Sequence, residues 1–138
     1  MTMDAAKIRA RLPAGPASLA GVLAAALLMA AAVSAGNGAP RLLVLLVLAP
    51  LAEETIFRIG LDESLLRRGV RASTACVLAA VAFALAHAFV RGDPAALVVA
   101  VPAVCIGLVY GRTRRLRDAV ALHAAMNAVW LAGGMLAY

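Results

Sequence analysis

Acidic, imidazole and amide side chains lie within long apolar stretches of this sequence. Four of them, from three separate stretches, are Glu53, His87, His123 and Asn127. A desolvated carboxylate can act as a general base toward water, and an imidazole can help to hold that water. A second imidazole and an amide NH₂ can donate hydrogen bonds to the oxyanion that forms when a peptide bond is attacked. The set therefore suits peptide hydrolysis.

Glu54 and Arg58 are four residues apart and share one face of a helix, so they could neutralise each other. For that pair a structural salt bridge is as good an interpretation as a catalytic role. Glu53 needs a different explanation, because adjacent residues of a helix point about 100° apart. We expect Glu53 to face a different partner.

Each remaining polar residue also has a structural interpretation. His123 and Asn127, again four apart, could simply bridge helices by hydrogen bonds, and His87 could be an interfacial histidine. Phe83, one turn before His87, is most simply a packing residue. A functional site is favoured for the set as a whole, because three apolar segments each contribute an acid, an imidazole or an amide. No serine or cysteine adjoins a histidine in sequence, so no nucleophile–base pair is indicated.

Composition places these residues in a membrane. The chain has 138 residues, of which 64% are hydrophobic and 14% charged, and its mean hydropathy is +0.95. Soluble domains carry about 25% charged residues. A charge in the bilayer core costs at least about 2.5 kcal/mol, so such residues normally face a bundle interior and mark a functional site. Cys76 and Cys105 lie in apolar runs, and we expect them to fill space.

The sequence predicts an all-α, polytopic membrane helical bundle that forms a single transmembrane domain over residues 1–138. About five transmembrane helices are expected, with a short amphipathic helix after the second. Gly69 is expected to end the extended second helix, Asp93 to cap the fourth and Asp118 the fifth. The expected helices cover residues 18–35, 41–58 with an extension to 68, 72–89, 94–110 and 119–137.

The basic residues predict an orientation. Ten of them precede the first helix or lie in the loops after the second and fourth, against two, Arg41 and Arg91, in the opposite loops. This asymmetry predicts a multi-pass protein of the cell (inner) membrane, with its N-terminus cytoplasmic and its C-terminus outside. The net charge of +6 therefore indicates lipid headgroups and no nucleic acid. A cleavable signal peptide ending near Ala35 is an alternative for the first helix.

Three motifs resemble the CPBP family of intramembrane glutamic endopeptidases, which comprises type II CAAX prenyl endopeptidases and bacteriocin-processing enzymes. They are Glu-Glu-x-x-x-Arg at 53–58, Phe-x-x-x-His at 83–87 and His-x-x-x-Asn at 123–127, in that order and in separate expected helices. The resemblance implies that Glu53 is the catalytic glutamate and His87 its partner on the attacking water. His123 and Asn127 would line the oxyanion site.

The same resemblance implies that Glu54 and Arg58 orient the second helix and that Phe83 forms the wall behind the water. It implies a membrane-anchored protein or peptide as substrate. The chain is shorter than most members, and it is most similar to short members associated with sorting signals. The glutamate mechanism needs no cofactor, but two histidines and a glutamate could also bind zinc or another divalent metal. A non-catalytic bacteriocin self-immunity or scaffold protein of the same fold is a further alternative.

The expected depths leave one question open. At 1.5 Å per residue, Glu53 lies about 18 Å below the outer surface and Asn127 about 14 Å above the inner face, which places them at one level. His87 is only four residues from Arg91 and hence near the outer edge. Either the third helix dips into the membrane before Arg91, or the cavity is tall and opens outward.

Overall fold

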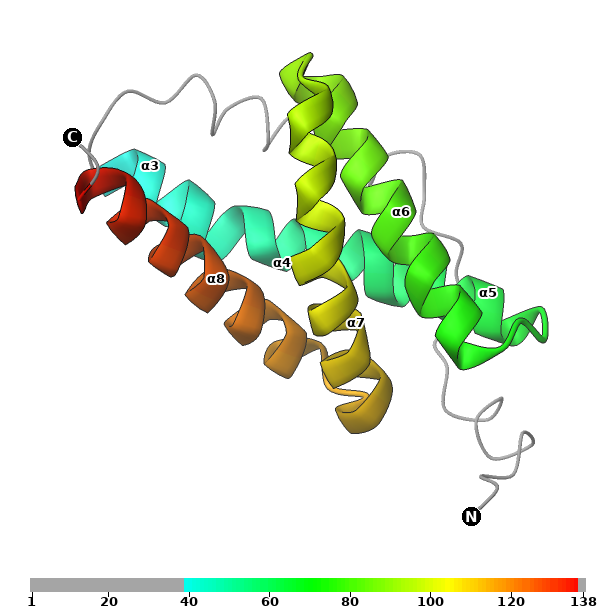
Figure 1. Ribbon diagram of the computed structural model, residues 1–138. Coiled ribbons are helices and arrows are strands. Elements are labelled where there is room, and N and C mark those ends of the chain that lie inside the picture. Colours follow the sequence, from blue (N-terminus) through cyan, green and yellow to red (C-terminus); the bar gives the residue numbers. More distant parts are fainter. Residues whose placement is uncertain (1–38, 137–138) are drawn as a thin grey trace.

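The computed structural model describes residues 39–136, which form helices and contain no strand (Figure 1). The all-α prediction is therefore confirmed for this part of the chain. The expected first helix at 18–35, with its alternative as a signal peptide, lies outside the described residues. The number of five transmembrane helices thus stays a prediction.

The first described element is a long rod of helical segments that follow one another without a break. It corresponds to the helix expected at 41–58 with its extension to 68, and it passes through Gly60 without ending. Gly69 follows the rod with a φ of +83°, a conformation that glycine adopts without steric cost. The segments are α3 Ala39–Leu43, η1 Val44–Leu48, α4 Ala49–Glu54, η2 Thr55–Asp62 and α5 Glu63–Arg67.

Two segments of the rod, η1 and η2, are π-helical. Pro50 accounts for the first, because proline has no N–H to donate to the preceding turn. The N–H of Ala49 donates to the carbonyl of Val44, five residues back, so the turn before Pro50 is wider than an α-helical one. π-Helical turns are frequent at functional sites, and η2 begins directly after Glu54.

The remaining helices are α6 Ala72–Arg91, η3 Pro94–Val99, α7 Ala100–Thr113 and α8 Leu116–Leu136. The Asp93 side chain accepts a hydrogen bond from the Ala95 N–H at 2.9 Å, as expected of an N-cap. The expectation for Asp118 is wrong: α8 begins at Leu116, so Asp118 lies inside its first turn. There the carboxylate still complements the positive end of the helix dipole.

The helices pack as neighbouring antiparallel pairs. α6 contacts η3 and α7, while α8 lies alongside η1 and α4 (Figure 1). Small residues allow this close approach. A Cβ atom on Gly107 of α7 would lie 2.5 Å from the Cys76 Sγ and 3.0 Å from the Arg58 Nη1. Cys76 is buried as expected, but Cys105 is exposed, so its thiol lies on the outer surface and fills no interior space.

The surface and the interior are reversed relative to a soluble protein. Large apolar side chains are exposed, among them Phe89 at 89% and Val129 at 73%. Charged side chains are buried: Glu54 and Arg58 are both 0% exposed. Two helices of the described part, Ala72–Arg91 and Pro94–Thr113, are long and apolar enough to cross a membrane. This distribution is that of a membrane protein, in which lipid covers the apolar faces.

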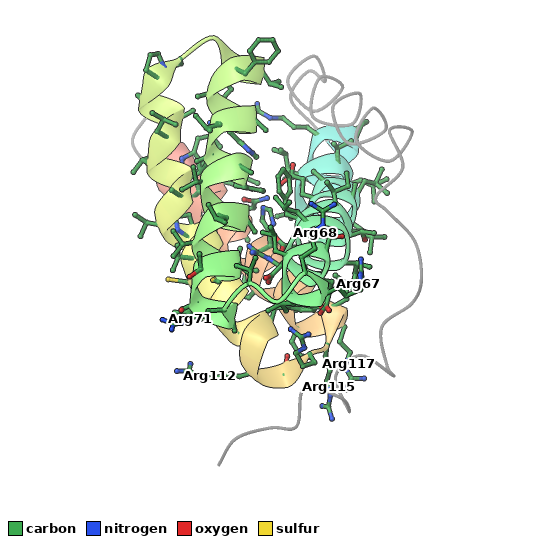
Figure 2. All side chains as sticks on the ribbon, turned by 90° about the vertical axis from the view of Figure 1, so that its right-hand side faces the viewer. Arg67, Arg68, Arg71, Arg112, Arg115 and Arg117 are labelled. Carbon is green, nitrogen blue, oxygen red and sulfur yellow. The ribbon has the colours of Figure 1, made fainter. Side chains whose placement is uncertain are left out.

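Basic side chains gather at one end of the bundle (Figure 2). They come from the turn between α5 and α6 and from the region that joins α7 to α8. The tertiary structure thus brings two basic clusters of the sequence to the same end, as the expected orientation requires. Figure 2 labels Arg67, Arg71, Arg112, Arg115 and Arg117 toward this end, and also Arg68, whose side chain extends further along the bundle.

The orientation can be tested by labelling single cysteines placed at the two ends of α6 and η3. In a Cys76→Ala/Cys105→Ala background, we expect a membrane-impermeant maleimide to label Ala95→Cys in intact bacterial cells. Arg71→Cys, at the basic end, should react only after the cells are lysed. Both positions are exposed, so accessibility within the protein is matched. The reverse labelling pattern would invert the expected topology.

Candidate active site

A cavity of about 450 Å³ lies between the helices of the bundle, and all four candidate residues line it. The rod, α6, the η3–α7 helix and α8 each contribute several side chains to its wall. Glu53, His87, His123 and Asn127 come from three of these four elements. The structure therefore brings together residues that are up to 74 positions apart in sequence (53 to 127).

The rod lines the cavity with every fourth residue: Arg41, Leu45, Ala49 and Glu53. In a regular α-helix, residues four apart drift by about 40° around the axis. The π-helical η1 has more residues per turn and offsets this drift, because it lies in the middle of the series. The side chains from Arg41 to Glu53 therefore remain on the face of the rod that lines the cavity.

A buried ion pair supports the floor of the cavity. Arg58 Nε donates to Glu54 Oε2 at 2.9 Å, and both side chains are excluded from solvent. Arg58 also donates through Nη2 to the Ala103 carbonyl of α7 at 2.9 Å. The pair expected from the four-residue spacing is thus present, and it ties the rod to a second helix. Arg58 itself does not line the cavity.

His123 lies between the two glutamates. Its Nδ1 is 2.8 Å from Glu54 Oε1, and its Nε2 is 3.6 Å from Glu53 Oε2. A carboxylate only accepts hydrogen bonds, so Nδ1 carries the proton and donates to Glu54. The Nε2 to Glu53 distance is too long for a direct hydrogen bond. Both atoms therefore remain available to a molecule in the cavity.

His87 is oriented by its own helix. Its Nδ1 lies 3.1 Å from the Phe83 carbonyl, one turn back, and a carbonyl acceptor requires the proton on Nδ1. In the neutral imidazole Nε2 then accepts a hydrogen bond. The Phe83 ring contacts both imidazoles, with centroid distances of 4.3 Å to His87 and 5.8 Å to His123. Phe83 thus lies against both histidines, in addition to packing on Phe57 at 5.1 Å.

The Asn127 side chain supplies a hydrogen-bond donor that Pro50 cannot supply within the rod. Ala49 donates to Val44, and Pro50 has no N–H, so the Leu45 carbonyl lacks a main-chain donor. The Asn127 Nδ2 donates to this carbonyl at 2.8 Å. An amide NH₂ has two N–H groups, so one is still free to donate into the cavity.

The cavity is tall. It reaches from Glu53 to Arg41 and Arg91, which lie at the far ends of their helices. His87 and Arg91 occupy one face of α6 and both line the same space. Of the two explanations for the depth of His87, the tall cavity agrees with this arrangement.

The side chains of this cavity that could ligate a metal are Glu53, His87 and His123. Among residues 39–136, no group of three or more histidine, cysteine, aspartate or glutamate side chains is placed to hold a metal ion. Glu54 and the Phe83 carbonyl engage the Nδ1 atoms of His123 and His87, so the Nε2 atoms are the ones left for a group in the cavity.

Sequence reasoning missed a second buried polar cluster at the basic end. The four-residue spacing of Glu63 and Arg67 indicates only a helical pair on a short amphipathic helix. Glu63 is instead buried, accepts a hydrogen bond from the Tyr110 hydroxyl at 2.9 Å and pairs with Arg114 at 2.8 Å. The neighbouring Asp62 is buried as well. Two adjacent acids directly after an apolar helix were the signal that could have indicated this cluster.

Comparison with known proteins gives one match. The family model of type II CAAX prenyl endopeptidase Rce1-like proteins matches residues 35–129, which is more than half of the chain. The matched region includes all three motifs and every residue of the candidate site. No curated protein and no solved structure matches the chain significantly.

The buried ion pair predicts that substitutions at Glu54 and Arg58 have strongly coupled effects on the free energy of unfolding. Arg58→Leu leaves the Glu54 carboxylate buried without its cation and should destabilise the protein by about 3–5 kcal/mol. Adding Glu54→Leu removes the stranded charge, so the double variant should regain much of the loss. Thermal unfolding in detergent measures this coupling. Additive losses in the two single variants would show that the pair does not act as a unit.

The Asn127 hydrogen bond predicts a second coupling, which involves Pro50. Asn127→Ala strands the Leu45 carbonyl and should cost about 1 kcal/mol. Pro50→Ala supplies a backbone N–H, so the same Asn127→Ala change should cost clearly less in that background. The measurement is a double-mutant cycle by thermal unfolding. Equal costs in both backgrounds would contradict the proposed link between Pro50 and Asn127.

Proposed function

The chain belongs to the family of type II CAAX prenyl endopeptidase Rce1-like proteins, and from this premise we propose that it is an intramembrane endopeptidase of the glutamic type. Its substrate is a membrane-anchored protein or peptide. One observation carries the proposal: a carboxylate, two imidazoles and an amide from three helices line one cavity inside a bundle with an apolar exterior.

In this proposal, Glu53 and His87 hold the attacking water. Glu53 is buried, and its side chain forms no hydrogen bond within residues 39–136. The Glu53 Oε2 lies 3.6 Å from the His123 Nε2. The Glu53 carboxylate accepts one proton of the water, while His87 Nε2 accepts the other, since its Nδ1 is engaged with Phe83. General-base assistance of this kind contributes about 10²–10⁴-fold to a rate.

His123 and Asn127 stabilise the oxyanion. When protonated, His123 presents its Nε2–H to the cavity, because Nδ1 donates to Glu54. Asn127 offers its second amide N–H while the first remains on the Leu45 carbonyl. Donors that are held in place before the reaction stabilise developing charge most effectively, since they need no reorganisation. The proton taken up by Glu53 then passes to the amine that leaves.

The supporting residues hold this arrangement in place. Glu54, paired with Arg58, fixes the ring of His123, and Phe83 packs against both imidazoles. The enzyme uses no cofactor in this mechanism. We place it in the inner membrane as a multi-pass protein, with the N-terminus cytoplasmic, the C-terminus outside, and no nucleic-acid partner.

Glu53→Gln tests the catalytic role. The substitution keeps the shape of the side chain but removes the base, so cleavage of a membrane-anchored reporter should fall by about 10²–10⁴-fold while the protein still folds. Asp118→Asn is the matched control, because it makes the same chemical change outside the cavity and should retain activity. The assay is the appearance of the cleaved fragment in proteoliposomes.

Full activity of Glu53→Gln would contradict the glutamate mechanism. The metal-dependent alternative is tested on the wild-type protein in the same assay, since the glutamate mechanism expects activity to persist in a strong chelator. Bacteriocin protection that survives in Glu53→Gln would instead favour the non-catalytic self-immunity function.

A further inference from the structure

Beyond the catalytic groups, the cavity carries a cation that the reaction does not use. Arg91 ends α6 and lies one helical turn after His87, and both side chains line the cavity. Arg91 is exposed, and its side chain forms no hydrogen bond or ion pair within residues 39–136, although its charge acts on the Glu53 carboxylate and the His87 imidazole. The nearest acid in sequence, Asp93, is engaged in capping η3.

The surroundings of Arg91 favour an extended occupant. A second hollow of about 350 Å³ lies beyond it, along η3, and the two hollows share Arg91, Val99, Pro102 and Trp130. A chain leaving the catalytic residues can therefore continue past Arg91 between Val99 and Trp130. The cavity wall also includes a second arginine, Arg41, at the start of the rod. The end of the cavity away from Glu53 thus carries Arg91, while Asp93, the N-cap of η3, lines the second hollow.

We propose that Arg91 selects peptide substrates with an acidic residue close to the scissile bond. The inference deepens the proposed peptidase function and rests on it for the identity of the occupant. Hydrogen bonds between ionised partners are stronger than those between neutral groups, so a carboxylate is the preferred partner of the Arg91 guanidinium. A guanidinium also binds a carboxylate through two parallel hydrogen bonds, which adds geometric selectivity.

The geometry gives the position of that residue. His87 and Arg91 are four residues apart, which is about 6 Å along an α-helix. An extended peptide advances about 3.3 Å per residue, so the acidic residue lies about two positions from the bond that is cut. It lies on the side of the cut that runs toward the second hollow. A lipid phosphate would recognise the same cation, but it would require no fixed spacing from the scissile bond.

A binding assay separates this inference from catalysis. The probes are fluorescent peptides with an apolar transmembrane helix and a short flanking segment that carries a single Asp at successive positions. Peptides with Asn or Lys at the same positions are the controls. Binding is measured to the wild-type protein and to Glu53→Gln in phosphatidylcholine nanodiscs. In both proteins we expect one Asp position to bind about tenfold more tightly than its Asn counterpart.

The charge of Arg91 should decide this preference. Arg91→Gln should abolish it, and Arg91→Glu should reverse it in favour of the Lys peptide at the same position. Arg115→Gln, an exposed arginine at the other end of the bundle, is the matched control and should leave it unchanged. A structural role alone would not produce the reversal.

Three outcomes would overturn the inference. The first is equal binding of the Asp and Asn peptides at every position. The second is a preference for Asp that survives Arg91→Glu. The third is an effect of Arg91 seen only in nanodiscs that contain phosphatidylglycerol, which would assign the cation to a lipid headgroup. If the charge preference is found but no peptide is cleaved by the wild type, the binding inference holds and the peptidase function fails.

Discussion

The ion pair between Glu54 and Arg58 is the constraint on which the rest of the bundle depends. Two charges without access to water must satisfy each other, and they gain further from partners within the protein, although the buried Arg58 Nη1 has none among the described residues. Arg58 therefore reaches the Ala103 carbonyl of α7, and Glu54 accepts the Nδ1–H of His123 on α8. One pair on the rod thus sets the rotation of two other helices. His123 Nε2 comes to lie 3.6 Å from Glu53 as a consequence.

Close packing of small residues makes these contacts possible. Gly107 leaves room for the Arg58 guanidinium and the Cys76 thiol, and Ala79 and Ala80 on α6 are fully buried. Larger side chains would separate the helices and lengthen the hydrogen bonds that cross between them. The large apolar side chains lie on the outer surface instead, where lipid rather than protein is the expected neighbour.

Irregular helix geometry shapes the cavity. Pro50 removes one backbone donor, and the π-helical segment before it keeps Arg41, Leu45 and Glu53 on one wall. The carbonyl left without a main-chain donor is the one that holds Asn127. A defect in the backbone hydrogen bonding of one helix therefore positions a polar side chain of another. Non-regular backbone is tolerated within a membrane bundle where protein groups satisfy it or where it lines a cavity.

The helical membrane character of this chain and the four-residue pairs on single helices follow from residue types and spacing alone. Glu54 with Arg58 and Phe83 with His87 could be predicted because their geometry depends only on local helix spacing. The groups that meet across helices could not be predicted in this way. His123 and Glu54, which are hydrogen-bonded, are 69 positions apart in sequence. Asn127 is 82 positions from the Leu45 carbonyl to which it donates, and Tyr110 is 47 positions from Glu63, its acceptor. These contacts depend on the rotation and register of packed helices, which no local pattern encodes.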